Sequence, residues 1–279
     1  MDTILWLENG GLMLRECEIT YNALPKNLKS RFPAIVAMPN TMLNMTSCKL
    51  IGSDTGHSGG VILLNANCQI SDCEMWNLNA GCIYSICKPH HNVTIQDCLL
   101  RDSKVAGVYC QGEGAKQLIQ RMEIRNVEGP GVKVARGNTC KVIGCNVSMS
   151  KCGVEAISCQ PLIAMNHFFK NYEDGIVTKA KNDLRCDAQI RFNTIERNKA
   201  NGILCTGKFN CTRIEKNLMI EKNKLAGIKT TDFASITICN NTVQSNYGQG
   251  ILLVESTFAH IEKNVIRTNY KANIAFGGE

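Results

Sequence analysis

The sequence predicts an all-β protein, a right-handed single-stranded parallel β-helix of about eleven coils. Three observations lead to this prediction. A short phrase of Asn, Gly and an aliphatic residue recurs in the C-terminal half, its frame continues to the N-terminus in steps of 21 to 31 residues, and apolar residues alternate within the units. Regular units of this length are typical of solenoid proteins, in which each repeat packs only on its neighbours.

The composition favours one elongated domain. The 279 residues contain no linker and no shift in composition, and 44% of them are hydrophobic while only 6% are aromatic. These values favour a core of stacked aliphatic side chains and cysteines. We therefore predict a single domain over residues 1–279.

The chain is expected to enter its first coil at once, with strands at residues 4–7 and 12–14, and to end without an evident cap. An uncapped coil exposes core side chains and an unpaired backbone edge. We expect the chain to be a domain of a longer protein, or to have a partner that covers an end. The first residues lack the features of a secretion signal, so the sixteen cysteines are expected to be reduced thiols in a cytoplasmic or cytoskeleton-associated protein.

A long insertion follows the first coil. Residues 21–41 contain Pro25, Pro33 and Pro39 together with a short basic stretch. Proline interrupts strand pairing, so we predict a projecting loop over this range.

One position recurs in every predicted coil, and in the first six coils an aliphatic residue or Met follows it two residues later. Its eleven occupants are Cys17, Cys48, Cys73, Cys98, Met122, Cys145, Asn166, Asn193, Asn217, Asn241 and Asn264. Asn and Gly tolerate the left-handed backbone that a sharp corner needs, and stacked Asn side chains can hydrogen-bond from coil to coil. We therefore expect a corner with stacked side chains at this column.

Short strands fill the rest of each coil. Apolar residues alternate at residues 118–124 and 236–238, which is the period of a strand. Helical repeats of similar length are excluded because Gly and Asn recur inside every unit. Three cysteine pairs with four-residue gaps could bind zinc, but two of them include a column member, so we expect core thiols and no metal site.

The repeat frame brings one polar cluster together on three consecutive coils. Asp72 lies on the first coil, Asp97 and Arg101 on the second, and Arg121 and Arg125 on the third. Stacked carboxylates could hold a metal ion or act as an acid/base pair. The interleaved arginines favour ion pairs instead. We therefore predict that these five residues form a binding patch, and we expect no catalytic residue, metal or cofactor.

The repeats resemble those of a known group. The phrases at residues 191–203 and 215–228 are similar to the parallel β-helix repeats called carbohydrate-binding and sugar-hydrolase domains, which have the pectin-lyase-like fold. The cysteine-rich coils most resemble the intracellular members, which are the Shc SH2-domain-binding protein family with its spindle-associated relatives and the β-helix F-box proteins. No F-box occurs here, so a ubiquitin-ligase function is not implied.

Two functional hypotheses follow. The first is a non-enzymatic intracellular protein-interaction scaffold in cytoskeletal, ciliary or cell-division machinery, whose Arg101, Arg121 and Arg125 bind an acidic protein. The alternative is a carbohydrate-active β-helix enzyme or glycan-binding domain that acts on an acidic polysaccharide through Asp72, Asp97 and a nearby arginine. The net charge of +7 permits an acidic partner. Nucleic acid is not expected, because aromatic residues do not interleave with a basic run, and no apolar run suggests a membrane partner.

Overall fold

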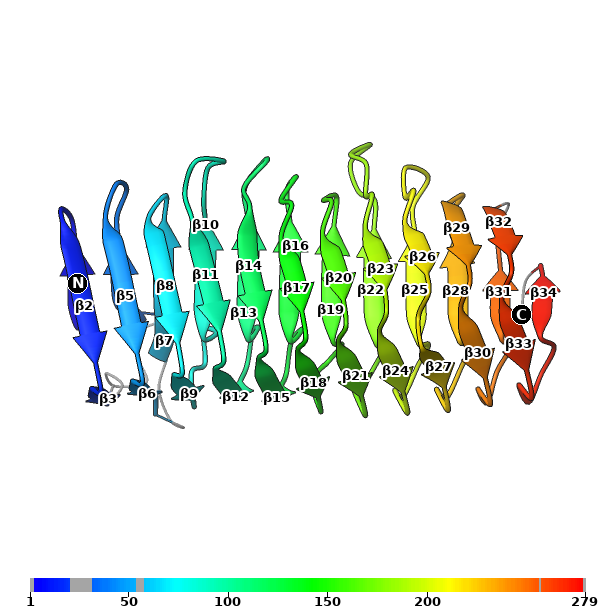
Figure 1. Ribbon diagram of the computed structural model, residues 1–279, viewed down its shortest axis with the longest axis horizontal. Helices are drawn as coiled ribbons and strands as arrows, with labels where there is room; N and C mark the ends of the chain where they lie inside the picture. The colour runs from blue at the N-terminus through cyan, green and yellow to red at the C-terminus, as the bar shows by residue number, and fades with distance from the viewer. Residues whose placement is uncertain (1–2, 21–31, 54–57, 256, 278–279) are drawn as a thin grey trace, which may run out of the picture.

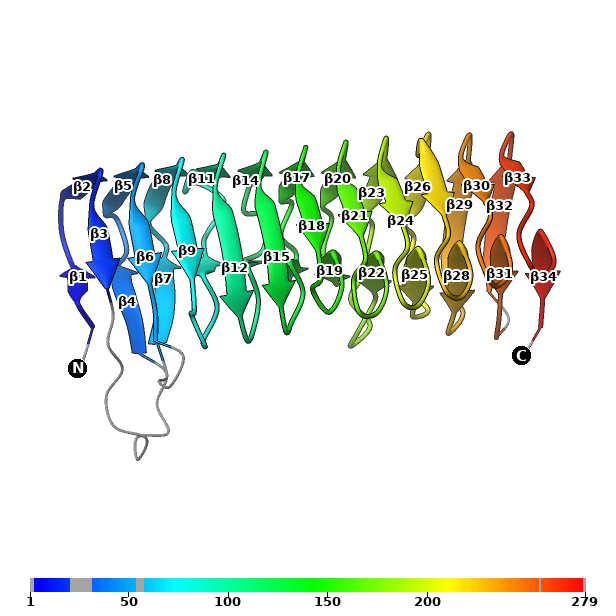
Figure 2. The same cartoon turned by 90° about the horizontal axis from the view of Figure 1, so that it is seen from below.

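The computed structural model describes residues 3–20, 32–53, 58–255 and 257–277. It is a rod of stacked coils with the two termini at opposite ends (Figure 1). Each coil contributes one short strand to each of three parallel sheets, which run the length of the rod (Figure 2). Within these ranges no helix is long and apolar enough to cross a membrane.

The three sheets are named A, B and C in the order in which a coil visits them. Sheet A contains β1 (Leu5–Leu7), β4 (Phe32–Ala37), β7 (Ser58–Leu64), β10 (Ile83–Ile86), β13 (Val108–Gln111), β16 (Val132–Ala135), β19 (Val154–Ile157), β22 (Ile176–Lys179), β25 (Ile203–Thr206), β28 (Ile228–Thr231), β31 (Ile251–Leu253) and β34 (Ile274–Phe276). Sheet B contains β2 (Gly11–Arg15), β5 (Met42–Thr46), β8 (Asn67–Ser71), β11 (Val93–Gln96), β14 (Gln117–Gln120), β17 (Lys141–Ile143), β20 (Leu162–Ala164), β23 (Gln189–Arg191), β26 (Arg213–Glu215), β29 (Ser235–Cys239) and β32 (Phe258–Glu262). Sheet C contains β3 (Glu18–Thr20), β6 (Lys49–Ile51), β9 (Glu74–Trp76), β12 (Leu99–Ser103), β15 (Glu123–Val127), β18 (Asn146–Ser148), β21 (His167–Phe169), β24 (Thr194–Glu196), β27 (Met219–Glu221), β30 (Thr242–Gln244) and β33 (Val265–Arg267).

This architecture confirms the predicted fold class. In the part of the chain that is described, sheets B and C each have eleven strands and sheet A has twelve. The strands therefore make eleven coils of three strands, followed by β34. Inward side chains alternate with outward ones along each strand, as strand geometry requires.

The core is aliphatic and rich in thiols. Phe168 is the largest fully buried side chain, and the others in the core are mainly Ile, Leu, Val, Met and Cys. All sixteen cysteines are free thiols and thirteen of them are buried. The prediction that the cysteine pairs pack in the core is confirmed, since reduced Cys packs as a small hydrophobic residue.

The recurrent column lies at the corner between sheets B and C. Asn193 illustrates the asparagine part of it. Its Oδ1 accepts the backbone N–H of Asn166 at 3.0 Å, and its Nδ2 donates to the carbonyl of Ile163 at 3.0 Å and to Oδ1 of Asn217 at 2.9 Å. The predicted coil-to-coil hydrogen bonds are therefore confirmed, and they satisfy backbone groups that the sheets leave unpaired at the corner.

The expected left-handed backbone lies one residue earlier than predicted. The residue before each column member has a positive φ in all eleven coils; these residues are Glu16, Ser47, Asp72, Asp97, Arg121, Gly144, Met165, Phe192, Lys216, Asn240 and Lys263. The column Asn is held instead by its ladder of hydrogen bonds. The recurrent Gly is needed because neighbouring coils approach each other closely there, and not because the backbone has a positive φ. A Cβ at Gly202 would lie 2.6 Å from the carbonyl oxygen of Gly227.

The predicted loop over residues 21–41 needs a correction at its C-terminal side. Residues 21–31 lie outside the described residues, but residues 32–37 form β4, which pairs with β1 and β7. Pro33 is accommodated because β1 pairs with β4 only from Ile35 onward. Proline has no backbone N–H to donate, and at Pro33 β4 does not pair with β1, so no hydrogen bond between these two strands is lost.

Candidate functional site

The predicted polar cluster spans three neighbouring coils, as its frame implied. Asp72, Asp97 and Arg121 occupy the left-handed corner position between sheets B and C. Arg101 and Arg125 lie side by side on β12 and β15 of sheet C. The structure therefore brings the five residues onto one region of the rod.

Each arginine of this cluster is paired with a carboxylate. Arg121 makes a two-pronged contact with Asp97, with Nε to Oδ1 at 2.6 Å and Nη2 to Oδ2 at 2.7 Å. These hydrogen bonds hold the pKa of Asp97 below its ordinary value. Asp97 and Arg121 thus neutralise each other within the cluster, and the binding role of the cluster stays a prediction.

Arg101 and Arg125 are engaged in the same way. Arg101 lies over the Trp76 ring, 4.8 Å from its centroid, and pairs with Asp102 at 2.6 Å. Arg125 pairs with Glu123 at 3.6 Å. An incoming anion would have to compete with these local carboxylates.

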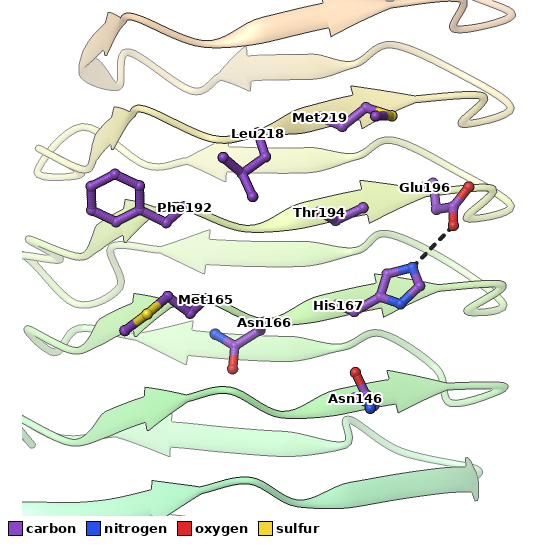
Figure 3. A pocket seen from close by; sticks show the side chains of 9 residues that line it. All are labelled: Asn146, Met165, Asn166, His167, Phe192, Thr194, Glu196, Leu218 and Met219. Atoms are coloured by element: carbon purple, nitrogen blue, oxygen red, sulfur yellow. Dashed lines mark hydrogen bonds and ion pairs between the residues drawn. The ribbon is translucent and has the colours of Figure 1, made fainter.

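A second region of sheet C offers a hollow surface, shown in Figure 3 and called here the sheet C groove. Its cavity volume is about 710 Å³. The nine residues that line it are Asn146, Met165, Asn166, His167, Phe192, Thr194, Glu196, Leu218 and Met219. They come from four consecutive coils.

The strand register forms the floor of the groove. Asn146, His167, Thr194 and Met219 pair in sequence across β18, β21, β24 and β27. These strands are only three residues long, and their central residue points inward. Each strand therefore presents its first and third residues outward.

An apolar edge lies beside this floor at the corner between sheets B and C. Met165 and Phe192 take the left-handed corner position, and Leu218 follows its column Asn. Met165 is 59% exposed and Leu218 is 61% exposed. Because the corner backbone directs these side chains away from the core, the groove gains an apolar wall that the fold itself does not need.

The polar part of the groove centres on one pair of titratable groups. His167 Nε2 lies 3.0 Å from Glu196 Oε1, as the dashed line in Figure 3 marks. The ring of Phe169 stacks on the imidazole, with centroids 4.4 Å apart, and Arg197 lies 3.3 Å from the other oxygen of Glu196. A carboxylate that contacts one ring nitrogen fixes the orientation of an imidazole, which can then transfer protons.

The groove contains a single carboxylate among its lining residues, that of Glu196. Glycoside hydrolysis generally needs two carboxyl groups on either side of the scissile bond. Among the described residues, no group of three or more His, Cys, Asp or Glu side chains could hold a metal ion. The pair of His167 and Glu196 is suited to proton transfer by an imidazole.

Sequence reasoning missed this pair, although a signal was available. His167 is the first residue after the column residue Asn166, and Glu196 is the third after Asn193. The offset of three residues also led to Arg101 and Arg125 of the arginine cluster. The frame therefore places His167 and Glu196 on adjacent coils, 29 residues apart in the sequence.

Comparison with known proteins gives a family and several similar folds. A family model described as "Right handed beta helix region" matches residues 58–219. No curated protein matches the sequence. Among solved structures, two mannuronan C-5 epimerase A-modules of Azotobacter vinelandii are similar to this chain. AlgE4 has a TM-score of 0.70 and 13% identity over 95% of this chain and 88% of its own. AlgE6 has a TM-score of 0.64 and 10% identity over 96% and 91%.

A third similar structure is a periplasmic alginate epimerase, AlgG, with a TM-score of 0.56 and 12% identity over 92% of this chain and 83% of its own. Identities this low establish a shared fold only. All three structures carry the names of polysaccharide epimerases, which contradicts the hypothesis of a cytoskeletal or cell-division scaffold with a protein partner. The comparisons give no support to the Shc-binding or F-box resemblance.

Proposed function

Because this chain belongs to the right-handed β-helix family, we propose that it is a carbohydrate-active protein that binds a polysaccharide in the sheet C groove. The observation that carries the proposal is the combination of an apolar edge with a polar floor along the rod. The apolar edge is formed by Met165, Phe192 and Leu218. Similarity of fold to three polysaccharide epimerases supports the choice of ligand class.

The chemistry of the groove suits a sugar ring. A pyranose has apolar C–H faces and a rim of hydroxyl groups. Phe192 and Leu218 can pack against a face, while Asn146 and Thr194 can exchange hydrogen bonds with hydroxyls. Binding sites generally combine an apolar surface with a few placed polar groups in this way.

The dimensions suit a chain that runs along the rod. The floor crosses four coils, and paired strands lie about 4.8 Å apart, so it extends for roughly 14 Å. One coil is close to the length of one pyranose residue. Successive sugars of an extended chain can therefore meet equivalent positions on successive coils.

The His167 and Glu196 pair is assigned the chemical step. His167 would transfer a proton to or from a sugar carbon or hydroxyl, and Glu196 would position the imidazole. The single groove carboxylate favours proton transfer over hydrolysis. Which sugar is bound is a matter for the binding assay.

Calorimetric titration with oligosaccharides of mannuronate, guluronate and neutral glucose polymers tests the binding site. We expect the Leu218→Asp variant to bind about tenfold more weakly than wild type, because a carboxylate replaces part of the apolar edge. Leu184→Asp is the matched control, since Leu184 is also an exposed leucine but does not line the groove. Equal binding by wild type and both variants would refute the groove as the site.

Proton transfer is tested separately. The polymer that binds is incubated with the protein in deuterated water, and its carbon-bound deuterium is followed by NMR. We expect exchange with wild type and at least about a hundredfold slower exchange with His167→Gln, while binding is retained. Glu196→Gln is expected to lower the rate less, because it leaves the imidazole in place. If the wild-type protein binds the polymer but causes no deuterium exchange, His167 has no role in proton transfer and the protein only binds the polysaccharide.

A further inference from the structure

A second candidate surface lies at the corner between sheets C and A, in the turns that lead from β21, β24, β27 and β30 to the next strands of sheet A (Figure 2). Tyr172, Lys199, Lys224 and Tyr247 occupy the same position in four consecutive coils; they are called here the lysine–tyrosine ridge. Each residue follows a buried Asn of a second ladder, and its backbone N–H donates to the preceding coil. The ridge is therefore held by the same repeat that builds the core.

The side chains of the ridge form two cation–π pairs. Lys199 Nζ lies 4.6 Å from the centroid of the Tyr172 ring, and Lys224 Nζ lies 4.9 Å from that of Tyr247. The two lysines are on adjacent coils. Tyr172 lies on the coil before Lys199, and Tyr247 lies on the coil after Lys224. Such pairs restrain an ammonium group without neutralising its charge. The ridge thus presents two restrained positive charges from adjacent coils, one directed toward Tyr172 and the other toward Tyr247.

A hollow of about 290 Å³ extends the positive charge beyond the ridge. Its ten lining residues are Asn201, Lys224, Leu225, Ala226, Lys229, Tyr247, Gly248, Gln249, Leu252 and Lys271. Three of the ten are lysines and none is an Asp or Glu. The floor contains Ala226 and Leu252, which are buried.

The carboxylates closest along the chain to Tyr172 are engaged elsewhere. Glu173 lies 3.8 Å from Lys151. Asp174 is buried, and its Oδ1 accepts hydrogen bonds from the backbone N–H and the side-chain amide of Asn201, both at 2.8 Å. These two carboxylates therefore have partners other than the lysines of the ridge.

We propose that the lysine–tyrosine ridge and its hollow form a second binding site, which takes an acidic saccharide bearing carboxylate or sulfate groups. Lys199 and Lys224 bind acidic groups at two points along one extended sugar chain, because the two lysines lie in a line along the rod and their ammonium groups are directed toward the first and the last coil of the ridge. The exposed side chain of Leu225 and the tyrosine edges contact the sugar rings. The choice of a saccharide among polyanions rests on the proposed function, whereas the positive charge of the ridge does not.

A single-stranded nucleic acid fits this surface less well. Bases bind to proteins by stacking on open aromatic faces. Here a lysine ammonium lies over one face of Tyr172 and over one face of Tyr247. The covered rings are poor platforms for bases, while the ammonium groups remain available to anions.

The test uses the Leu218→Asp background, so that the sheet C groove contributes less to binding. Titrations with an alginate oligosaccharide, which carries carboxylates, and a heparin oligosaccharide, which also carries sulfates, identify the preferred acidic group. The ridge variant is Lys199→Gln with Lys224→Gln. The control is Lys49→Gln with Lys88→Gln, which changes the net charge equally at two exposed lysines of distant coils. We expect the ridge variant to bind at least about tenfold more weakly and with a smaller salt dependence, and the control to stay within about twofold.

The outcomes separate the two sites. An equal loss in the ridge variant and the control would overturn the proposal, as would tighter binding of single-stranded DNA than of either oligosaccharide. If the groove proposal fails, Leu218→Asp has no effect on binding in otherwise wild-type protein, and the ridge variant still loses binding. If the ridge proposal fails, the ridge substitutions have no effect in either background.

Discussion

The N-terminal and C-terminal halves of the rod place different side chains at the corner between sheets B and C. From Asn166 to Asn264 the corner between sheets B and C holds a continuous asparagine ladder. In the N-terminal half a cysteine takes the same position in every coil except that of Met122. The backbone N–H of Cys48 donates to Cys73 Sγ at 3.4 Å, and that of Cys73 donates to Cys98 Sγ, also at 3.4 Å.

The difference shows that the column position has two separable requirements. It must fill the space between coils, which a cysteine does, and it must accept the backbone N–H of the preceding coil, for which sulfur is only a weak acceptor. Asparagine also donates its amide to a carbonyl of the preceding coil. The asparagine half is therefore more dependent on each member of its column than the cysteine half.

The largest expected effect comes from removing one ladder residue in each half. Asn193→Ala leaves the backbone N–H of Asn166 and the carbonyl of Ile163 without their partner. Since each buried unsatisfied group costs about 1–3 kcal/mol, we expect a loss of roughly 3–5 kcal/mol in the free energy of unfolding. Cys73→Ala removes a smaller group and a weaker acceptor, and we expect about 1–2 kcal/mol. Urea unfolding followed by circular dichroism measures both, and equal losses would contradict the comparison.

Replacing a column cysteine by asparagine tests the comparison at the point where the cysteine half meets the asparagine ladder. Cys145 lies next to the ladder, because its N–H already donates to Asn166 Oδ1 at 2.8 Å and its Sγ faces the carbonyl of Ile119. Cys145→Asn can therefore extend the ladder, and we expect a change within about 1 kcal/mol.

A cysteine-to-asparagine substitution inside the cysteine half provides the comparison for Cys145→Asn. Cys73→Asn has sulfur neighbours on both sides and no amide to continue its hydrogen bonds. We expect it to lower the free energy of unfolding by about 2–3 kcal/mol. Thermal melting of the two variants side by side checks the order, and a more stable Cys73→Asn than Cys145→Asn would refute it.

The smallest effect concerns a carboxylate in the asparagine half. Burial raises the pKa of Asp174 above its ordinary value, although hydrogen bonds from Asn201 act in the opposite direction. A raised folded pKa means that the folded state holds its proton longer, so this group lowers stability as the pH rises above about 3.8, the ordinary value. Asp174→Asn keeps the acceptor for Asn201 without the buried charge. We expect the variant to gain stability over wild type between pH 4 and pH 7, measured by urea unfolding, and no gain at the lower pH.

Much of the fold follows from the sequence because the repeat imposes one frame. Asn166, Asn193 and Asn217 recur at nearly constant spacing, and each coil must present the same groups to the next. The left-handed residue before each of them was missed for a physical reason. That corner position points outward and constrains only the backbone, so its occupants range from Gly144 to Phe192 and give no signal of residue type.

The site was less predictable than the fold. The clustering of carboxylates and arginines in the repeat frame predicted a binding patch that includes Asp97 and Arg121. In the structure these two side chains neutralise each other. His167 and Glu196 share the same frame, but single residues at different offsets do not form a motif in the sequence. Whether a surface position is hollowed depends on the side chains of neighbouring coils, which the frame alone does not give.

The parallel pairing between coils has a mechanical consequence. The hydrogen bonds that join the coils point along the rod, so a pull on its two ends loads the interfaces between coils in series, and the weakest interface opens first. On the argument above, that interface lies in the cysteine half. Under tension the molecule should lengthen by peeling coils there, while the asparagine half, with its groove and its lysine–tyrosine ridge, stays wound.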